Sequence, residues 1–261
     1  MRQRVPMALV ISLWALTAST TTSRAEHLVV SLSTHRVLIN SSFTGAELVL
    51  FGSVERDGGT VSRRGGYDIV VTVKGPPETA VTRRKDRVLG IWVNVESRTF
   101  ADAPTYLAVL ANRPVQEIGP PDVLRRQHIG LADALLPQVI PGDIAEVGPG
   151  DAFRAAFIRL NTERGLYREE ENSVSFLTPN LFQASIQLPA SVPIGNYEVD
   201  VKLFADGALL SRQSSTIDVV RVGFEQFVAG AARDHGTVYG FTTAMLALLT
   251  GWLASVVFRR D

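Results

Sequence analysis

The sequence predicts a mainly β protein that is exported and held by one C-terminal transmembrane helix. Three observations predict this class. Short runs rich in Val, Ile and Leu alternate with turn residues from residue 28 onward, the first 25 residues have the order of a secretory signal peptide, and residues 236–258 carry no charge. The expected β region therefore lies between two segments that are directed to a membrane.

Residues 1–25 are expected to form the signal peptide. Arg2 and Arg4 precede an apolar stretch at residues 5–18, and the small residues Ser23 and Ala25 flank a cleavage position after Ala25. The alternative is an uncleaved N-terminal anchor, although 14 apolar residues are short for a span of about 20. In either case the basic N-terminus stays inside, and the middle of the chain is exported.

Two sets of short strands are expected in the exported region. They define a first β-sandwich domain at residues 26–119 and a second β-rich domain with helices at residues 120–222. Their spacing suits antiparallel sandwiches. Tyr106 and Tyr197 resemble tyrosine corners, which favours two immunoglobulin-like units with helical insertions. One continuous sandwich is the alternative. Within the first set, RVLGIWVNV is expected to form one strand.

Two helices are expected near residues 122–136 and 151–164. In the first, Leu124, His128, Leu131 and Leu135 would share one face, and Pro137 would end the helix. The second begins at Asp151, a plausible N-cap, and ends at Gly165. The sequence also places Arg159 four residues before Glu163, which suits an ion pair on the helix surface.

The C-terminal run at residues 236–258 predicts a transmembrane helix. As a helix it is about 34 Å long, which matches a hydrocarbon core of about 30 Å, whereas a buried core helix rarely stays uncharged for 23 residues. Arg259 and Arg260 place the tail, residues 259–261, in the cytoplasm. Just before the span, residues 223–235 form an expected amphipathic juxtamembrane segment with apolar residues at helical spacing.

Small residues within the span predict a contact with another helix. They form two small-x-x-x-small pairs, Gly240 with Ala244 and Ala247 with Gly251. Such pairs let two helix backbones approach closely in a bilayer. These four residues are the candidate contact residues for a membrane-protein partner.

Composition excludes several kinds of function. The chain has no cysteine, so disulfides, thiolate nucleophiles and cysteine-ligated metals are excluded. Residues 26–261 carry 23 basic and 26 acidic residues, and this balance speaks against a nucleic-acid partner. The four histidines form no H-E-x-x-H pattern, and no G-x-S-x-G elbow occurs. We therefore expect no cofactor, no metal site and no enzyme activity.

Two features of the first β domain could take part in binding. Trp92 either packs between sheets or stands on a binding surface, and core packing is the favoured interpretation. Arg83, Arg84 and Lys85, like Arg63 and Arg64, are expected on exposed hairpin loops. There they serve solubility, or alternatively face anionic headgroups or an anionic ligand.

Several stretches resemble a family of alphaproteobacterial transmembrane proteins labelled Alph_Pro_TM. The most specific are FTGAEL, GIWVN and GWLAS, and the resemblance covers nearly the whole chain after residue 25. It implies a bacterial inner membrane and a periplasmic domain, and it points to a sulfite-exporter-type permease as a candidate partner. It carries over no catalytic residue.

These observations favour a membrane-anchored periplasmic accessory or binding module. The alternative is a periplasmic membrane-bound enzyme acting on a small molecule or an envelope component. A deep pocket with converging acidic, basic and imidazole groups would favour the enzyme. An exposed apolar patch would favour the accessory module.

Overall fold

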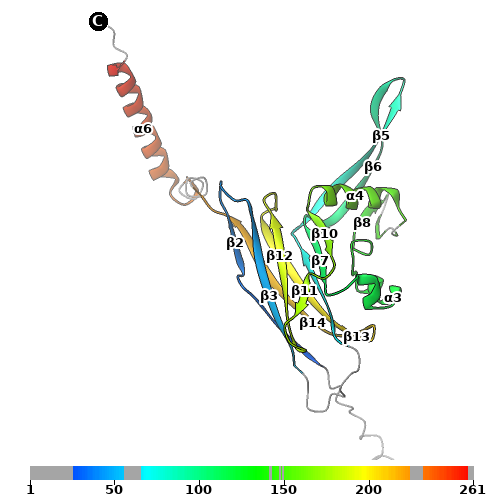
Figure 1. The fold of residues 1–261 in the computed structure, drawn as a ribbon. Coiled ribbons are helices and arrows are strands. Elements are labelled where there is room, and N and C mark those ends of the chain that lie inside the picture. Colours follow the sequence, from blue (N-terminus) through cyan, green and yellow to red (C-terminus); the bar gives the residue numbers. More distant parts are fainter. Residues whose placement is uncertain are drawn as a thin grey trace, which may run out of the picture.

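Two stacked β-sheets, a third sheet that projects from them and a separate C-terminal helix make up the fold (Figure 1). The computed structural model describes residues 26–55, 66–140, 143–146, 148, 150–223 and 232–257. The expected signal peptide at residues 1–25, the pair Arg63 and Arg64, and the expected tail at residues 259–261 lie outside the described residues. The mainly β class is confirmed.

The first sheet contains four antiparallel strands in the order β1-β3-β12-β11. Every second residue of β3 faces inward, and Leu48, Leu50 and Val54 are buried there. Gly52 continues this inward row because the ring of Phe182 occupies the space of its side chain. The strand bounds are β1 (His27–Leu32), β3 (Gly45–Glu55), β11 (Val174–Phe176) and β12 (Leu181–Pro189).

The second sheet contains six strands in the order β10-β7-β4-β13-β14-β2. Its inner pairs are antiparallel, whereas the two outermost pairs, β10 with β7 and β14 with β2, are parallel. The central strand β4 is buried on both faces, as its run of Ile and Val predicts. The bounds are β2 (Arg36–Ile39), β4 (Asp68–Lys74), β7 (Leu107–Ala111), β10 (Tyr167–Glu170), β13 (Gly195–Ala205) and β14 (Ala208–Arg221).

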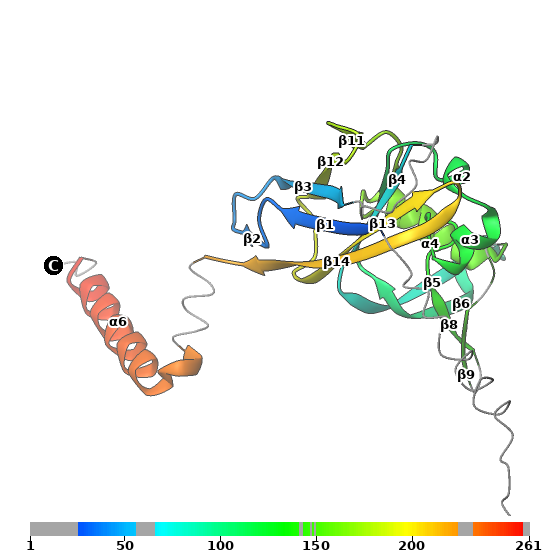
Figure 2. The same cartoon turned by 90° about the horizontal axis from the view of Figure 1, so that it is seen from below.

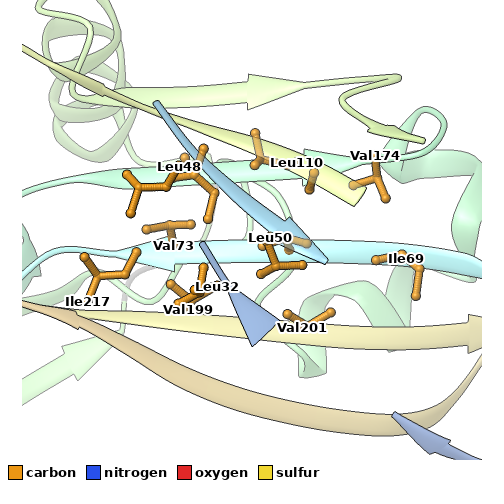
Figure 3. Close-up of a cluster of buried hydrophobic side chains, with 14 of the residues drawn as sticks. Leu32, Leu48, Leu50, Ile69, Val73, Leu110, Val174, Val199, Val201 and Ile217 are labelled. Carbon is orange, nitrogen blue, oxygen red and sulfur yellow. The ribbon is translucent and has the colours of Figure 1, made fainter. Parts of the chain in front are cut away.

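The largest core lies between these two sheets. Side chains from both sheets, among them Leu48 and Leu50 of β3 and Val73, Val199 and Val201 of the second sheet, gather in the space between them (Figure 3). Burial of this apolar surface at about 25 cal/mol per Å² is the main term that holds the sheets together. This core occupies the middle of the β region.

Immunoglobulin-like units are not confirmed. Strands from residues 26–119 and from residues 120–222 pair with each other in both sheets, β3 with β12 and β4 with β13. The pairing covers strand edges that two separate small sheets would leave open. The two sets of strands therefore share their sheets.

The two tyrosines that suggested those units make different hydrogen bonds. The Tyr197 hydroxyl donates to the carbonyl oxygen of Pro193, 2.6 Å away and four residues upstream, as a tyrosine corner does. The Tyr106 hydroxyl instead donates across to Gln187 of β12 at 2.8 Å. Their rings lie 5.8 Å apart, and the Tyr106 hydrogen bond links them to the first sheet.

Two short helices cover the outer face of the second sheet. They are α2 (Val115–Ile118) and α3 (Pro121–Arg126), and their apolar residues pack on Val70 and Phe204. The expected helix at residues 122–136 was too long. It ends at Arg126 because His128 and Gly130 have positive φ angles, which interrupt an α-helix. His128, Leu131 and Leu135 therefore share no helical face.

The third sheet is a long hairpin extended by two short strands. The order is β5-β6-β8-β9, with β5 (Pro77–Val88), β6 (Ile91–Pro104), β8 (Pro137–Ile140) and β9 (Asp143–Glu146). RVLGIWVNV is not one strand, because Leu89 and Gly90 have positive φ angles and turn the chain back. Positive φ at both central residues is the requirement of a two-residue type I′ turn, and glycine meets it without strain.

Helix α4 (Ala152–Glu163) confirms the second expected helix. The Asp151 side chain caps it and accepts a hydrogen bond from the backbone amide of Arg154 at 2.8 Å. The expected surface pair is also present, with Arg159 and Glu163 joined at 2.9 Å. This helix packs beside the base of the hairpin.

Helix α6 (Gly236–Val257) follows the β region and none of its side chains is buried. It is the one helix among the described residues that is long and apolar enough to cross a membrane. Most of the expected amphipathic segment at residues 223–235 lies outside the described residues, which resume at residue 232. Figure 2 shows α6 set apart from the sheets.

Candidate interaction surface

The tip of the β5–β6 hairpin carries several neighbouring apolar side chains that are exposed. Leu89 is 97% exposed in the turn, and Ile91 and Trp92 are each 67% exposed at the start of β6. Val88 and Val93 are exposed beside them. The favoured interpretation of Trp92 as a core residue was wrong, because the turn at Leu89 and Gly90 carries it away from every buried cluster of the described chain.

Basic side chains follow the apolar tip along β5. Arg83, Arg84, Lys85 and Arg87 are all exposed, but they lie in strand β5, whereas the first three were expected on a hairpin loop. Arg84 pairs with Glu96 across the hairpin at 3.4 Å, between two exposed side chains. Such a pair contributes about 0–1 kcal/mol, so the arrangement is not explained by the stability that it adds.

The base of the hairpin is held firmly by aromatic packing. The rings of Phe100 on β6 and Phe157 on α4 stack with their centroids 4.6 Å apart. The Tyr167 hydroxyl donates to the carbonyl oxygen of Pro104 at 2.7 Å. The Arg98 guanidinium lies 5.0 Å from the centre of the Phe153 ring. The hairpin therefore projects from a packed base, as Figure 1 shows.

Helix α6 brings the four predicted contact residues onto one face. Gly240, Ala244, Ala247 and Gly251 follow an i, i+4, i+7, i+11 spacing, which places them in one stripe of an α-helix. A side-chain carbon added to either glycine would meet no atom of the described chain within 4 Å. The stripe is therefore open to another helix.

The hydroxyls of three threonines in α6 donate hydrogen bonds to backbone carbonyls of the same helix. The Thr243 hydroxyl donates to the carbonyl oxygen of Tyr239 at 2.9 Å, and the Thr250 hydroxyl donates to that of Leu246 at the same distance. Thr242 bonds in the same way to Val238 at 2.8 Å. In a bilayer each unsatisfied polar group costs several kcal/mol, so these bonds suit a helix surrounded by lipid.

A buried charged cluster occupies the outer face of the second sheet. Asp200 lies 2.8 Å from the Lys202 ammonium and 2.6 Å from the Arg212 guanidinium, and the side chains of Asp200 and Lys202 are almost completely buried. Burial lowers the pKa of Lys202, whereas the hydrogen bond to Asp200 raises the pKa of Arg212. Because Asp200 and Lys202 are closed off from solvent, they offer no binding surface.

The polar groups that could support an enzyme line a different, shallow pocket. It has a volume of about 280 Å³, and its polar lining residues are Lys74, Asp102, His128, Asn196 and Glu198. The His128 ring nitrogen Nδ1 lies 3.3 Å from the carbonyl oxygen of Asp133. Glu198 pairs with Arg212 at 3.8 Å. These contacts arrange no nucleophile with a base among the described residues, and those residues contain no group of metal ligands.

Comparison with known proteins finds one family, and its match covers the chain from β1 through α6. A family model described as "Putative transmembrane protein (Alph_Pro_TM)" matches residues 27–260. The chain belongs to this family. The Alph_Pro_TM match runs from β1 through α6, so the β region and the apolar helix belong to one family unit. No curated protein and no solved structure is found to match the chain.

The apolar hairpin tip is the part of this Alph_Pro_TM protein that sequence reasoning placed wrongly. RVLGIWVNV has the composition of a buried strand, and its valines and isoleucine are the residues that such a strand needs. The signal that could have found the turn is Gly90 in the middle of the run, since an isolated glycine interrupts a strand pattern. The basic run Arg83, Arg84 and Lys85 just before it is the second signal.

Proposed function

We propose that this protein is a membrane-anchored accessory module without enzyme activity. In this proposal the signal peptide directs export, the β region lies in the periplasm beside the bacterial inner membrane, and α6 crosses that membrane with its tail in the cytoplasm. The family described as transmembrane and the length of α6 support a single-pass membrane protein. Arg259 and Arg260 after the apolar run support the cytoplasmic tail.

The observation that carries the accessory role is the unpartnered stripe on α6. Export alone would keep a soluble β region in the periplasm, so the anchor has a further purpose. The stripe of Gly240, Ala244, Ala247 and Gly251 is free within the described chain. Helices with small residues at this spacing pack closely on other membrane helices. The partner in this proposal is an integral membrane protein, with a sulfite-exporter-type permease as the first candidate.

The anchor makes a weak contact sufficient. Two proteins confined to one membrane meet at a high effective concentration, so occupancy does not require a large interface. The exposed hairpin tip supports the accessory role over the enzyme, because exposed apolar patches of this kind mark interaction sites. The enzyme alternative would rely on the shallow pocket with Asp102, His128 and Glu198.

The test is purification in mild detergent after cross-linking in membranes. The unaltered chain should bring down a membrane protein, and Gly240→Leu combined with Gly251→Leu should reduce its recovery at least several-fold. Thr242→Leu is the control because Thr242 lies on the opposite side of the helix and receives the same apolar leucine there. Recovery of a lone monomer, together with full function of an untethered exported form, would reject the accessory role and favour the enzyme.

A further inference from the structure

We propose that the β5–β6 hairpin is a second membrane contact, whose apolar tip inserts among the headgroups of an anionic bilayer. This inference rests on the proposed anchoring by α6, and it concerns a separate surface of the β region. The ligand chemistry is a lipid surface with negative headgroups and apolar chains. Five observations on the hairpin and its connection to the anchor lead to it.

The hairpin and the membrane anchor leave the same end of the second sheet. Strands β4 and β14 both pair antiparallel with β13, so they run in the same direction. The chain enters the hairpin after the last residue of β4, Lys74, and it leaves for α6 after the last residue of β14, Arg221. Figure 1 shows the hairpin tip and α6 both rising above the two stacked sheets. The end of the sheet that gives rise to the anchor thus also gives rise to the hairpin.

The connection to α6 is short enough to keep the tip near the bilayer. Residues 222–235 lie between β14 and α6, and 14 residues span at most about 50 Å even when fully extended. The hairpin itself has 12 residues in β5, which at about 3.3 Å per residue give a reach of about 40 Å. The length of the hairpin is therefore comparable with the maximum length of the connection to α6, so the tip can reach the membrane that α6 crosses.

The order of side chains along the hairpin matches the layers of a membrane surface. Leu89, Ile91 and Trp92 stand at the extreme tip, where apolar chains begin. Arg87 is the cross-strand partner of Trp92, and Lys85 and Arg84 follow further back. Tryptophan and long basic side chains are the residues that favour the interface, the former among headgroups and the latter toward phosphates. The apolar tip therefore precedes the charged part in the order that insertion requires.

The charge of the hairpin complements anionic headgroups. Residues 83–98 contain five basic and two acidic side chains, an excess of three positive charges, while the whole chain has a net charge of zero. Near an anionic surface each basic side chain adds to the attraction, and the effect fades within a Debye length of about 10 Å. The positive charge of the hairpin thus lies where it would act on a membrane.

The apolar residues surround the tip, which favours lipid over a protein partner. Val88 pairs with Ile91 and points to one face of the ribbon, whereas Trp92 pairs with Arg87 and points to the other. A protein that docks on one face would leave the opposite face in water. A lipid interface encloses the tip from all sides and covers both faces at once.

The test uses the fluorescence of Trp92 in the full chain. The protein has three tryptophans, so Trp14→Phe with Trp252→Phe leaves Trp92 alone, and Trp14→Phe with Trp92→Phe leaves Trp252 as the control in the span. Each variant is placed in vesicles of phosphatidylcholine with phosphatidylglycerol, with and without brominated acyl chains. We expect at least twofold quenching of Trp92 by the brominated lipid and a shift of its emission to shorter wavelength.

A matched variant separates the two parts of the contact. A triple variant with Arg83→Gln, Arg84→Gln and Lys85→Gln should show at least twofold less quenching of Trp92. The unaltered hairpin should show the same reduction in vesicles of phosphatidylcholine alone. Quenching of Trp252 should not change in either case. Unquenched Trp92 beside quenched Trp252 would overturn the proposal. A photoreactive residue at position 92 that cross-links to a protein and not to lipid would also overturn the proposal. This outcome would count against the lipid contact even if the α6 partner still copurified.

Discussion

The carboxylate of Asp200 lies 2.8 Å from the ammonium group of Lys202, and both side chains are almost completely buried. They stand two residues apart on β13 and share the outer face of the second sheet, on which alternate residues of that strand lie. Arg212 joins them from β14 at 2.6 Å and is half exposed. The cluster therefore reaches water only through Arg212.

Removal of Asp200 should destabilise the protein strongly. Asp200→Ala leaves the Lys202 ammonium buried without its carboxylate, and breaking a buried pair in this way costs about 3–5 kcal/mol. Lys202→Met should cost much less, because Asp200 keeps Arg212 and the methionine fills a similar volume. Urea denaturation of both variants, followed by the far-ultraviolet circular dichroism of the β region, measures the difference. Equal stability of the two variants would show that the buried charge is not the cause.

Gly52 should tolerate no side chain. A carbon added there would lie 2.2 Å from the Phe182 ring, which is fully buried between the sheets. Gly52→Ala should therefore lower the free energy of unfolding by about 1–3 kcal/mol, the usual range for overpacking a core. Gly66→Ala is the matched control, since a carbon at that position meets no atom within 4 Å. If both variants unfolded at the same urea concentration, the inferred contact would be wrong.

The sequence predicted the apolar helix, the mainly β class and α4, because each depends on a local pattern. The apolar run of α6 and the N-cap Asp151 of α4 are both recognised from residues that are adjacent in the sequence. Strand pairing is different. The pairing of β3 with β12 joins residues more than 100 positions apart. The sequence of neither strand identifies the strand with which it pairs. The predicted division into separate immunoglobulin-like units failed because the sequence does not show which strands pair.

The candidate surface was missed for a related reason. Trp92 and Ile91 have the composition of a core strand, and only the turn at Leu89 and Gly90 carries them outward. Leucine rarely adopts a positive φ angle, so within the run only Gly90 signalled the turn. The helix expected at residues 122–136 failed in the same way, because the positive φ angle of His128 ended it early. Both errors came from backbone angles that side-chain patterns do not report.

Alkaline pH should weaken the fold through three buried tyrosines. Burial raises the pKa of Tyr106 to about 12, and it raises the pKa of Tyr167 and Tyr197 further. The ordinary pKa is about 10, so above pH 10 the unfolded chain loses these protons first. Stability is then fully present below about pH 10 and falls as the pH rises toward 12, by at most about 1.4 kcal/mol per pH unit for each tyrosine.

Urea denaturation at pH 9, 10 and 11 measures this loss. Tyr106→Phe should make the fall between pH 10 and 11 less steep, because one of the three groups is gone. The absorbance of tyrosinate gives a second measurement, since at pH 11 no more than two of the five tyrosines of the folded chain should be ionised. Ionisation of all five in the folded protein would contradict the burial of these hydroxyls.

Labelling of single cysteines in intact cells tests whether the β region is exported and tied to the membrane by one span. The chain has no cysteine of its own, so Ser175→Cys on the exposed side of β11 and Asp261→Cys at the C-terminal end each give one reactive site. With a maleimide that cannot cross the inner membrane, Ser175→Cys should be labelled in intact cells and Asp261→Cys should be labelled only after lysis. Labelling of Asp261→Cys but not Ser175→Cys in intact cells would contradict this topology.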